Sequence, residues 1–100
     1  MITIEVDNKG FLKITNNGSF LVKIWKIEFT YYIYTQPLKK EEEERGGRRY
    51  ISESIDKTFE VGPGESMRYY IKLPPEVIKE VIVYYEEGGS FKKSYMRLNP

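Results

Sequence analysis

The longest alternation of apolar and polar residues in this chain lies at positions 20–34, FLVKIWKIEFTYYIY. From Trp25 onward every second residue is aliphatic or aromatic, while polar residues such as Lys26 fall between them. Successive side chains of a β-strand point to opposite faces, so this period of two predicts a strand with one buried face. Around Lys23 the apolar residues have the opposite phase. That change predicts a β-bulge near residues 24–25, or a strand that bends between two sheets there.

Six shorter stretches predict further strands, because each combines β-branched or aromatic residues with turn residues at its ends. Two of them precede the long strand, and we expect these three strands to form a meander. Glu53 and Lys57 interrupt one apolar pattern, which is typical of an edge strand guarded by charges. In the last strand we expect Phe91 and Tyr95 to point inward, with Met96 as a further candidate. The six predicted strands cover residues 2–6, 11–15, 51–61, 67–73, 79–87 and 90–98.

The pattern stops at residues 35–49, TQPLKKEEEERGGRR, where Leu38 is the single apolar side chain. Pro37 argues against a strand in the interior of a sheet, since proline cannot donate a ladder hydrogen bond. So polar a segment buries too little surface to offset the entropy of ordering it. We therefore predict a mobile charged loop here, of a length that is usual for functional or disordered segments.

The strand count and the recurring turns predict an all-β fold, namely a seven-stranded antiparallel immunoglobulin-like β-sandwich spanning residues 1–100 as a single domain. In such a sandwich Trp25 is expected to be the core anchor between the two sheets. The alternative is a small OB-type or other β-barrel, because five or six of these strands could close on themselves.

Composition narrows the function classes. The 16 basic and 15 acidic residues give a net charge of +1, so bulk charge favours neither nucleic acid nor a membrane surface. The chain has no Cys and no His, which removes disulfides, thiolate chemistry and the commonest general base and metal ligand. We therefore expect a protein that is not an enzyme and that uses no cofactor. The absence of alanine supports the all-β assignment.

The environment can be predicted from two further features. The chain has 13 Glu against 2 Asp and 11 Lys against 5 Arg, an enrichment typical of hyperthermophile proteins, so we expect a thermophilic archaeon or one of its viruses as the source. It begins with a strand pattern rather than a signal peptide and holds no run of about 20 apolar residues. If the chain is complete as given, we expect it to be cytoplasmic.

Two segments carry a family resemblance: ITNNGSFLVKIWKIEF and, later in the chain, FEVGPGESMRYYIKLP. In both, a turn rich in Asn, Gly or Pro leads into an alternating strand. They resemble the Ig-like sandwich domains of archaeal surface proteins and of cell-adhesion-related proteins, and they cover about half of the chain. The resemblance implies a sandwich fold and a binding or scaffolding role rather than catalysis.

Three groups of residues are candidates for binding. Outward tyrosines on one sheet would form an aromatic patch for a protein partner or a second copy, since tyrosine covers apolar area while its hydroxyl reaches a partner. Exposed aromatics could also stack sugar rings, and this carbohydrate-binding alternative rests on Tyr32 and Tyr34. Arginines beside two glycines could contact phosphates of a nucleic acid. The tyrosines are Tyr32, Tyr34, Tyr70 and Tyr84, and the arginines are Arg45, Arg48 and Arg49.

Each candidate has a plainer interpretation. The four glutamates at 41–44 would repel a phosphate backbone, so the charged segment reads more simply as a solvated, self-neutralising loop. These glutamates also make a poor metal site, because consecutive strand residues point to opposite faces. The function that we favour is a structural or protein-interaction module, which binds through the tyrosine-bearing face or by strand addition at the edge strand of residues 51–61.

Overall fold

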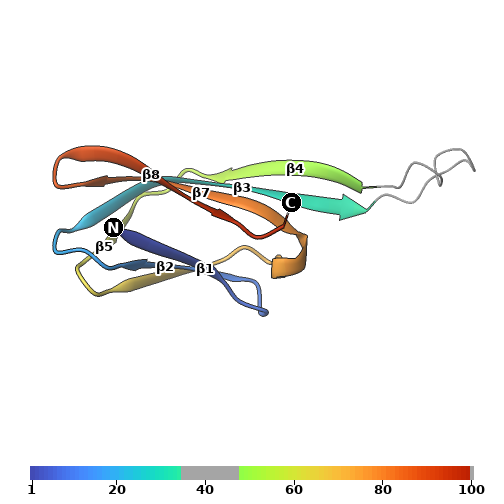
Figure 1. Cartoon of the computed structure of the whole chain (residues 1–100), viewed down its shortest axis with the longest axis horizontal. Coiled ribbons are helices and arrows are strands. Elements are labelled where there is room, and N and C mark those ends of the chain that lie inside the picture. The colour runs from blue at the N-terminus through green and yellow to red at the C-terminus, as the bar shows by residue number, and fades with distance from the viewer. Residues whose placement is uncertain (35–47, 100) are drawn as a thin grey trace, which may run out of the picture.

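The structure, a computed structural model, describes residues 1–34 and 48–99, and for Tyr34 and Arg48 it describes the backbone alone. The described residues form two antiparallel sheets that lie face to face as two layers (Figure 1). The all-β, sandwich-like fold is therefore confirmed. Closure into a single barrel is not observed, because the strands divide between two separate sheets.

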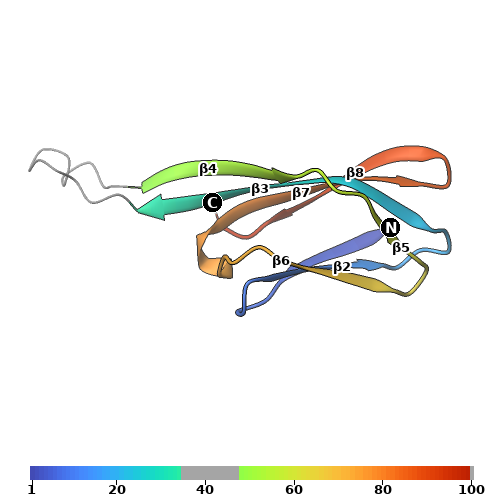
Figure 2. The ribbon, with the colours of Figure 1, turned by 180° about the vertical axis from the view of Figure 1, so that it is seen from behind.

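The smaller sheet has three strands in the order β1-β2-β6, and the larger has five, in the order β4-β3-β7-β8 with β5 also paired to β3. Figure 2 shows both layers from behind. A short 3-10 turn, η1 (Pro75–Val77), leads from the small sheet into β7. The strands are β1 (Ile2–Val6), β2 (Phe11–Asn16), β3 (Val22–Tyr34), β4 (Arg48–Ile55), β5 (Phe59–Val61), β6 (Ser66–Tyr70), β7 (Ile78–Glu87) and β8 (Ser90–Arg97).

The part of the chain that the structure describes thus contains eight strands instead of the seven predicted. The difference arises at residues 51–61, which were expected to form one strand. β4 ends at Ile55 and β5 begins at Phe59, and the two pair with different parts of β3. β4 forms one edge of the larger sheet, so the edge position is confirmed for its residues.

The predicted meander of the first three strands is wrong. β1 pairs with β2, and the other neighbour of β2 is β6, which follows about fifty residues later in the chain. β3 belongs to the other sheet, so the chain changes layers between Asn16 and Val22. Local turn chemistry predicted where each strand ends, but a turn of the same composition serves a hairpin or a crossover between sheets.

Asn16 holds the chain at this change of layers. It is fully buried, and its side-chain amide donates to the carbonyls of Phe20, at 2.7 Å, and Val61, at 2.9 Å. Its side-chain oxygen accepts from the amide of Gly18 at 2.9 Å. Its backbone amide donates to Glu65, and its carbonyl accepts from Gly64. One buried residue thus links the end of β2 to the crossover and to the turn between β5 and β6.

The core lies between the inner faces of the two sheets. The small sheet contributes Leu12 and Ile14, both fully buried, and β7 contributes Val81 and Val83. These residues alternate with exposed or half-buried neighbours along each strand, as a sheet with one covered face requires. In β2 this alternation is already visible in the sequence, where Leu12 and Ile14 are the apolar pair.

The predicted bulge in the long strand is confirmed. The pairing of β3 with β7 shifts register between Ile24 and Lys26, which leaves Trp25 as the extra residue. Ile24 and Ile27 are both fully buried, so the inward phase resumes only after the bulge. Trp25 instead lies at the surface with 44% of its area exposed. Its prediction as core anchor is wrong, because the bulge turns the tryptophan to the outer face.

β3 and β4 extend beyond the rest of the larger sheet (Figure 1). The pairing of β3 with β7 ends where Tyr31 meets Ile78, whereas its pairing with β4 continues to Tyr34 and Arg48. η1 begins with a proline at this point, and proline is tolerated at the start of a helical turn. The last residues of β3 therefore form a two-stranded ribbon with β4.

We expect Asn16→Asp to lower the free energy of unfolding by about 2–4 kcal/mol, since a carboxylate cannot donate to the two buried carbonyls. Denaturation in guanidinium chloride measures the change. Asn17→Asp is the matched control, because Asn17 is the exposed neighbour, and it should alter stability by less than about 0.5 kcal/mol. Equal losses in the two variants would contradict the role assigned to Asn16.

Candidate functional site

Four aromatic side chains lie on the outer face of the larger sheet, which faces away from the small sheet. We call this set the outer aromatic face: Trp25 of β3, Tyr84 of β7, and Phe91 and Tyr95 of β8. Phe91 is 75% exposed and Tyr95 is 54% exposed, while Tyr84 is half-buried between the flanking strands. Large exposed side chains gathered on one sheet face are unusual in a protein that has no partner.

The bulge in β3 brings Trp25 to Tyr84. Their ring centroids are 5.3 Å apart with the planes tilted by 44°. This is a favourable spacing for an aromatic pair, so the two rings hold each other in place on the surface. Bulges often redirect a side chain near a functional site, and here the bulge places the single tryptophan of the chain in the solvent-facing layer.

Two lysines flank the centre of the outer aromatic face, one on each strand beside β7. The Lys26 amine lies 5.8 Å from the ring centre of Tyr84, and the Lys93 amine lies 5.6 Å from that of Tyr95. In the register of the sheet, Tyr84 sits between these two lysines, with Lys26 on β3 and Lys93 on β8. An open hollow of about 240 Å³ lies here, lined by Trp25, Tyr84, Phe91, Lys92 and Lys93.

Lys92 is held at the margin of this hollow by Glu87. The Lys92 amine donates to the Glu87 carboxylate at 3.0 Å, and the Met1 amino group pairs with the other carboxylate oxygen. Glu87 is only 8% exposed, so these two cations compensate a largely buried negative charge. A Cβ atom at Gly18 would come within 2.8 Å of the same carboxylate, so a larger residue there would require Glu87 to shift.

The pKa of Glu87 is lowered by these contacts. The hydrogen bond from the Met1 amino group contributes most, the hydrogen bond from Lys92 adds to it, and burial opposes both. The same pairing raises the pKa of Lys92. Both side chains are therefore charged at neutral pH, and their ion pair fixes the edge of the hollow.

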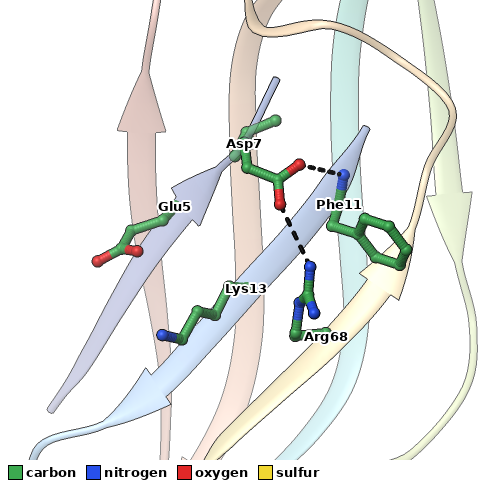
Figure 3. Close-up of a pocket in the computed structure, with 6 residues that line it drawn as sticks. Glu5, Asp7, Phe11, Lys13 and Arg68 are labelled. Atoms are coloured by element: carbon green, nitrogen blue, oxygen red, sulfur yellow. Dashed lines mark hydrogen bonds and ion pairs between the residues drawn. The ribbon is translucent and has the colours of Figure 1, made fainter. Parts of the chain in front are cut away.

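A second hollow, of about 320 Å³, lies on the outer face of the small sheet (Figure 3). Two of its charged groups, Asp7 and Arg68, are paired with each other. Asp7 accepts from the backbone amides of Lys9 and Phe11, and from Arg68 at 3.3 Å. The amide of Phe11 does most to lower the pKa of Asp7, and Arg68 also lies over the Phe11 ring at 4.4 Å. We interpret this cluster as a brace for the β1–β2 hairpin.

The tyrosine set predicted from the sequence does not form one patch. Tyr32 is buried, with 4% of its area exposed. Its ring centroid lies 4.9 Å from that of Tyr50, the residue of β4 that pairs with it. Tyr70 is exposed but belongs to the small sheet, on the opposite side of the molecule from Tyr84. Of the described side chains in this set, Tyr84 alone lies at the outer aromatic face. Because Tyr32 is buried, its ring is not accessible for stacking against a sugar, as the carbohydrate hypothesis requires. The side chain of Tyr34, the other residue of that hypothesis, lies outside the described residues.

The charged candidates remain largely untested. Arg45 and the glutamates at 41–44 lie outside the described residues, as does the side chain of Arg48. Arg49 is exposed at the start of β4, opposite Ile33 of β3. The nucleic-acid hypothesis therefore stays a prediction. Within residues 1–34 and 48–99, no cluster of three or more acidic side chains is suited to hold a metal ion.

Sequence reasoning missed three of the four residues at the outer aromatic face. It placed Trp25 in the core and turned Phe91 and Tyr95 inward, whereas all three are exposed. In β8 a signal was present, because Lys93 and Arg97 share the parity of the two aromatics, and strand charges usually face solvent. For Trp25 the sequence predicts a bulge at residues 24–25. The side chain that turns outward depends on which of these residues is the extra one, and the structure shows that it is Trp25.

No protein-family model, curated protein sequence or solved structure matches this chain. In the described ranges, no helix has the length and apolar character needed to cross a membrane. The candidate site therefore rests on the geometry of the outer aromatic face.

We expect Glu87→Gln to destabilise the protein at neutral pH, with an effect that disappears in acid. A carboxylate whose pKa is lowered by folding stabilises the native state above its unfolded pKa, and this stability is lost as the pH falls through the folded pKa. The difference in unfolding free energy between the two proteins should be largest above about pH 5 and shrink toward pH 3. Urea denaturation across this range measures it, and a difference independent of pH would contradict the ion-pair role.

Proposed function

We propose that this chain is a non-enzymatic, immunoglobulin-like interaction module that binds another protein, or a second copy of itself, through the outer aromatic face. The observation that carries the proposal is the exposure of Trp25 on a β-bulge, in contact with Tyr84 and beside Phe91. Tryptophan and tyrosine are enriched among the residues that dominate protein interfaces.

The sheet orders support the immunoglobulin-like part of the proposal. In that fold the strands A, B and E are neighbours in one sheet, and C, F and G are neighbours in the other. The order β1-β2-β6 corresponds to A-B-E, and the order β3-β7-β8 corresponds to C-F-G, with β4 added beside C. The Ig-like domains of archaeal surface and adhesion-related proteins, which the turn motifs resemble, are the class to which we assign it.

The shape and chemistry of the face support a protein partner. A sheet face is broad and nearly flat, as interfaces between folded proteins are, and its aromatic centre is bordered by charged residues such as Lys26 and Glu28. Interfaces have this arrangement of an apolar centre and a polar rim, and each partner contributes about 800 Å². The chain has neither His nor Cys, which supports binding rather than catalysis.

Site-specific photocrosslinking in the source cell tests this proposal. With p-benzoylphenylalanine in place of Phe91, we expect a discrete crosslinked product, whose mass would distinguish a second copy from another protein. Trp25→Ala should reduce the yield of this product at least about tenfold, because it removes a central interface residue.

The matched control places the same crosslinker at Tyr70, which is exposed on the opposite sheet. This position should not give the product. Tyr70→Ala should also leave the Phe91 crosslink unchanged. No product from position 91, or the same products from both positions, would contradict binding through the outer aromatic face.

A further inference from the structure

The hollow on the outer aromatic face is lined by aromatic and cationic side chains only. Its walls are Trp25, Tyr84 and Phe91, and its two charged groups are Lys92 and Lys93. No carboxylate belongs to the lining, although acidic residues are nearly as frequent as basic ones in the chain as a whole. A ligand that enters the hollow therefore meets apolar rings and positive charge together.

Lys93 differs from the other lysines at this face. Lys26 is paired with Glu28 at 3.1 Å, and Lys92 is paired with Glu87 at 3.0 Å. Among the described residues no carboxylate forms an ion pair with Lys93, whose amine instead lies over the Tyr95 ring. Tyr95 and, more weakly, Glu28 raise the pKa of Lys93, but no described carboxylate pairs with its amine directly. Lys93 is therefore the lysine of the hollow that a carboxylate of a partner could pair with.

The arrangement favours a peptide over a nucleic acid as the source of the anion. Glu86 lies directly across from Phe91, and Glu28 is paired with Lys26, so acidic side chains border the hollow on two sides. These would repel a continuous phosphate backbone, which needs several cations in a row. A protein segment can supply a single carboxylate beside an apolar side chain. The carboxylate would pair with Lys93, and the apolar side chain would contact the rings that line the hollow.

We propose that this hollow binds an acidic-aromatic segment of a protein partner, in which an apolar side chain packs against Trp25, Tyr84 and Phe91 while a neighbouring carboxylate pairs with Lys93. This inference rests on the proposed interaction function and names the chemistry of the partner. A charge beside an aromatic surface and partly removed from water interacts more strongly than one in bulk solvent. Lys93 thereby selects among partners by charge, and the rings supply the shared apolar contact.

Two blocked dipeptides test the charge selection by NMR titration of the isotope-labelled chain. One contains glutamate followed by phenylalanine, and the other has lysine in place of glutamate. We expect the acidic dipeptide to shift the Trp25 indole signal and the amides of Phe91 and Lys93, and to bind about fivefold more tightly than the basic one. Lys93→Glu should reverse this order. Lys13→Glu, on the exposed outer face of the small sheet, is the matched control and should leave it unchanged.

The outcomes separate this inference from the proposed function. Equal binding of both dipeptides at these residues, or a preference that persists in Lys93→Glu, would overturn the charge selection and leave apolar docking intact. Absence of any shift at the outer aromatic face, or shifts confined to the small sheet, would overturn the inference outright. A single-stranded oligothymidylate that binds the same residues more tightly than the acidic dipeptide would overturn the assignment to a peptide. The crosslinking experiment judges the interaction function independently.

Discussion

The two-layer fold depends on the hydrogen bonds of one buried amide. The chain leaves the small sheet at Asn16 and enters the larger sheet at Val22, and the backbone between them belongs to no strand. Backbone polar groups in such a segment need partners, because leaving them unpaired in the interior is costly. The Asn16 side chain supplies partners to Gly18, Phe20 and Val61, and its backbone pairs with the β5–β6 turn. A hydrophobic residue there could fill the space, but it would leave these carbonyls and this amide without partners.

A second constraint follows from the length of β3, which runs from Val22 to Tyr34 and is paired to three other strands. Its early residues face β5 across the sheet and its later residues face β4, and the register with β7 shifts at Ile24–Lys26 and again at Thr30–Tyr31. Each shift lets a twisted strand keep its apolar residues over the core. The first shift also exposes Trp25, so a feature that serves packing on one face of the sheet places an aromatic side chain on the other.

The sequence predicted local features well and long-range ones poorly, for physical reasons. Period-two alternation and the bulge near residues 24–25 depend on neighbouring residues, and the structure confirms both. Alternation shows that two sets of side chains lie on opposite faces, but it does not say which face another sheet covers. For that reason the prediction that Phe91 and Tyr95 point inward was wrong. Tyr32 was predicted to lie at the surface, yet Tyr50 of β4, eighteen positions later in the chain, packs against it. Burial of this kind depends on which strand pairs alongside, and the residues next to Tyr32 in the sequence do not reveal it.

The two outer faces of the sandwich differ in how far their side chains satisfy one another. On the small sheet, Arg68 binds Asp7 and lies over the ring of Phe11, which also contacts Tyr70. Thr15 forms a hydrogen bond with Ser66. On the larger sheet, Phe91 is the most exposed aromatic among the described residues, and Lys93 lacks an acidic partner there. Both faces are built from the same residue types, so composition does not separate them. What separates them is the neighbourhood of the aromatic rings: on the small sheet Phe11 is covered by Arg68, which Asp7 holds, whereas on the larger sheet Phe91 is largely exposed beside Lys93, which has no carboxylate partner among the described residues. An interaction through the larger sheet would supply the contacts that its own residues do not make.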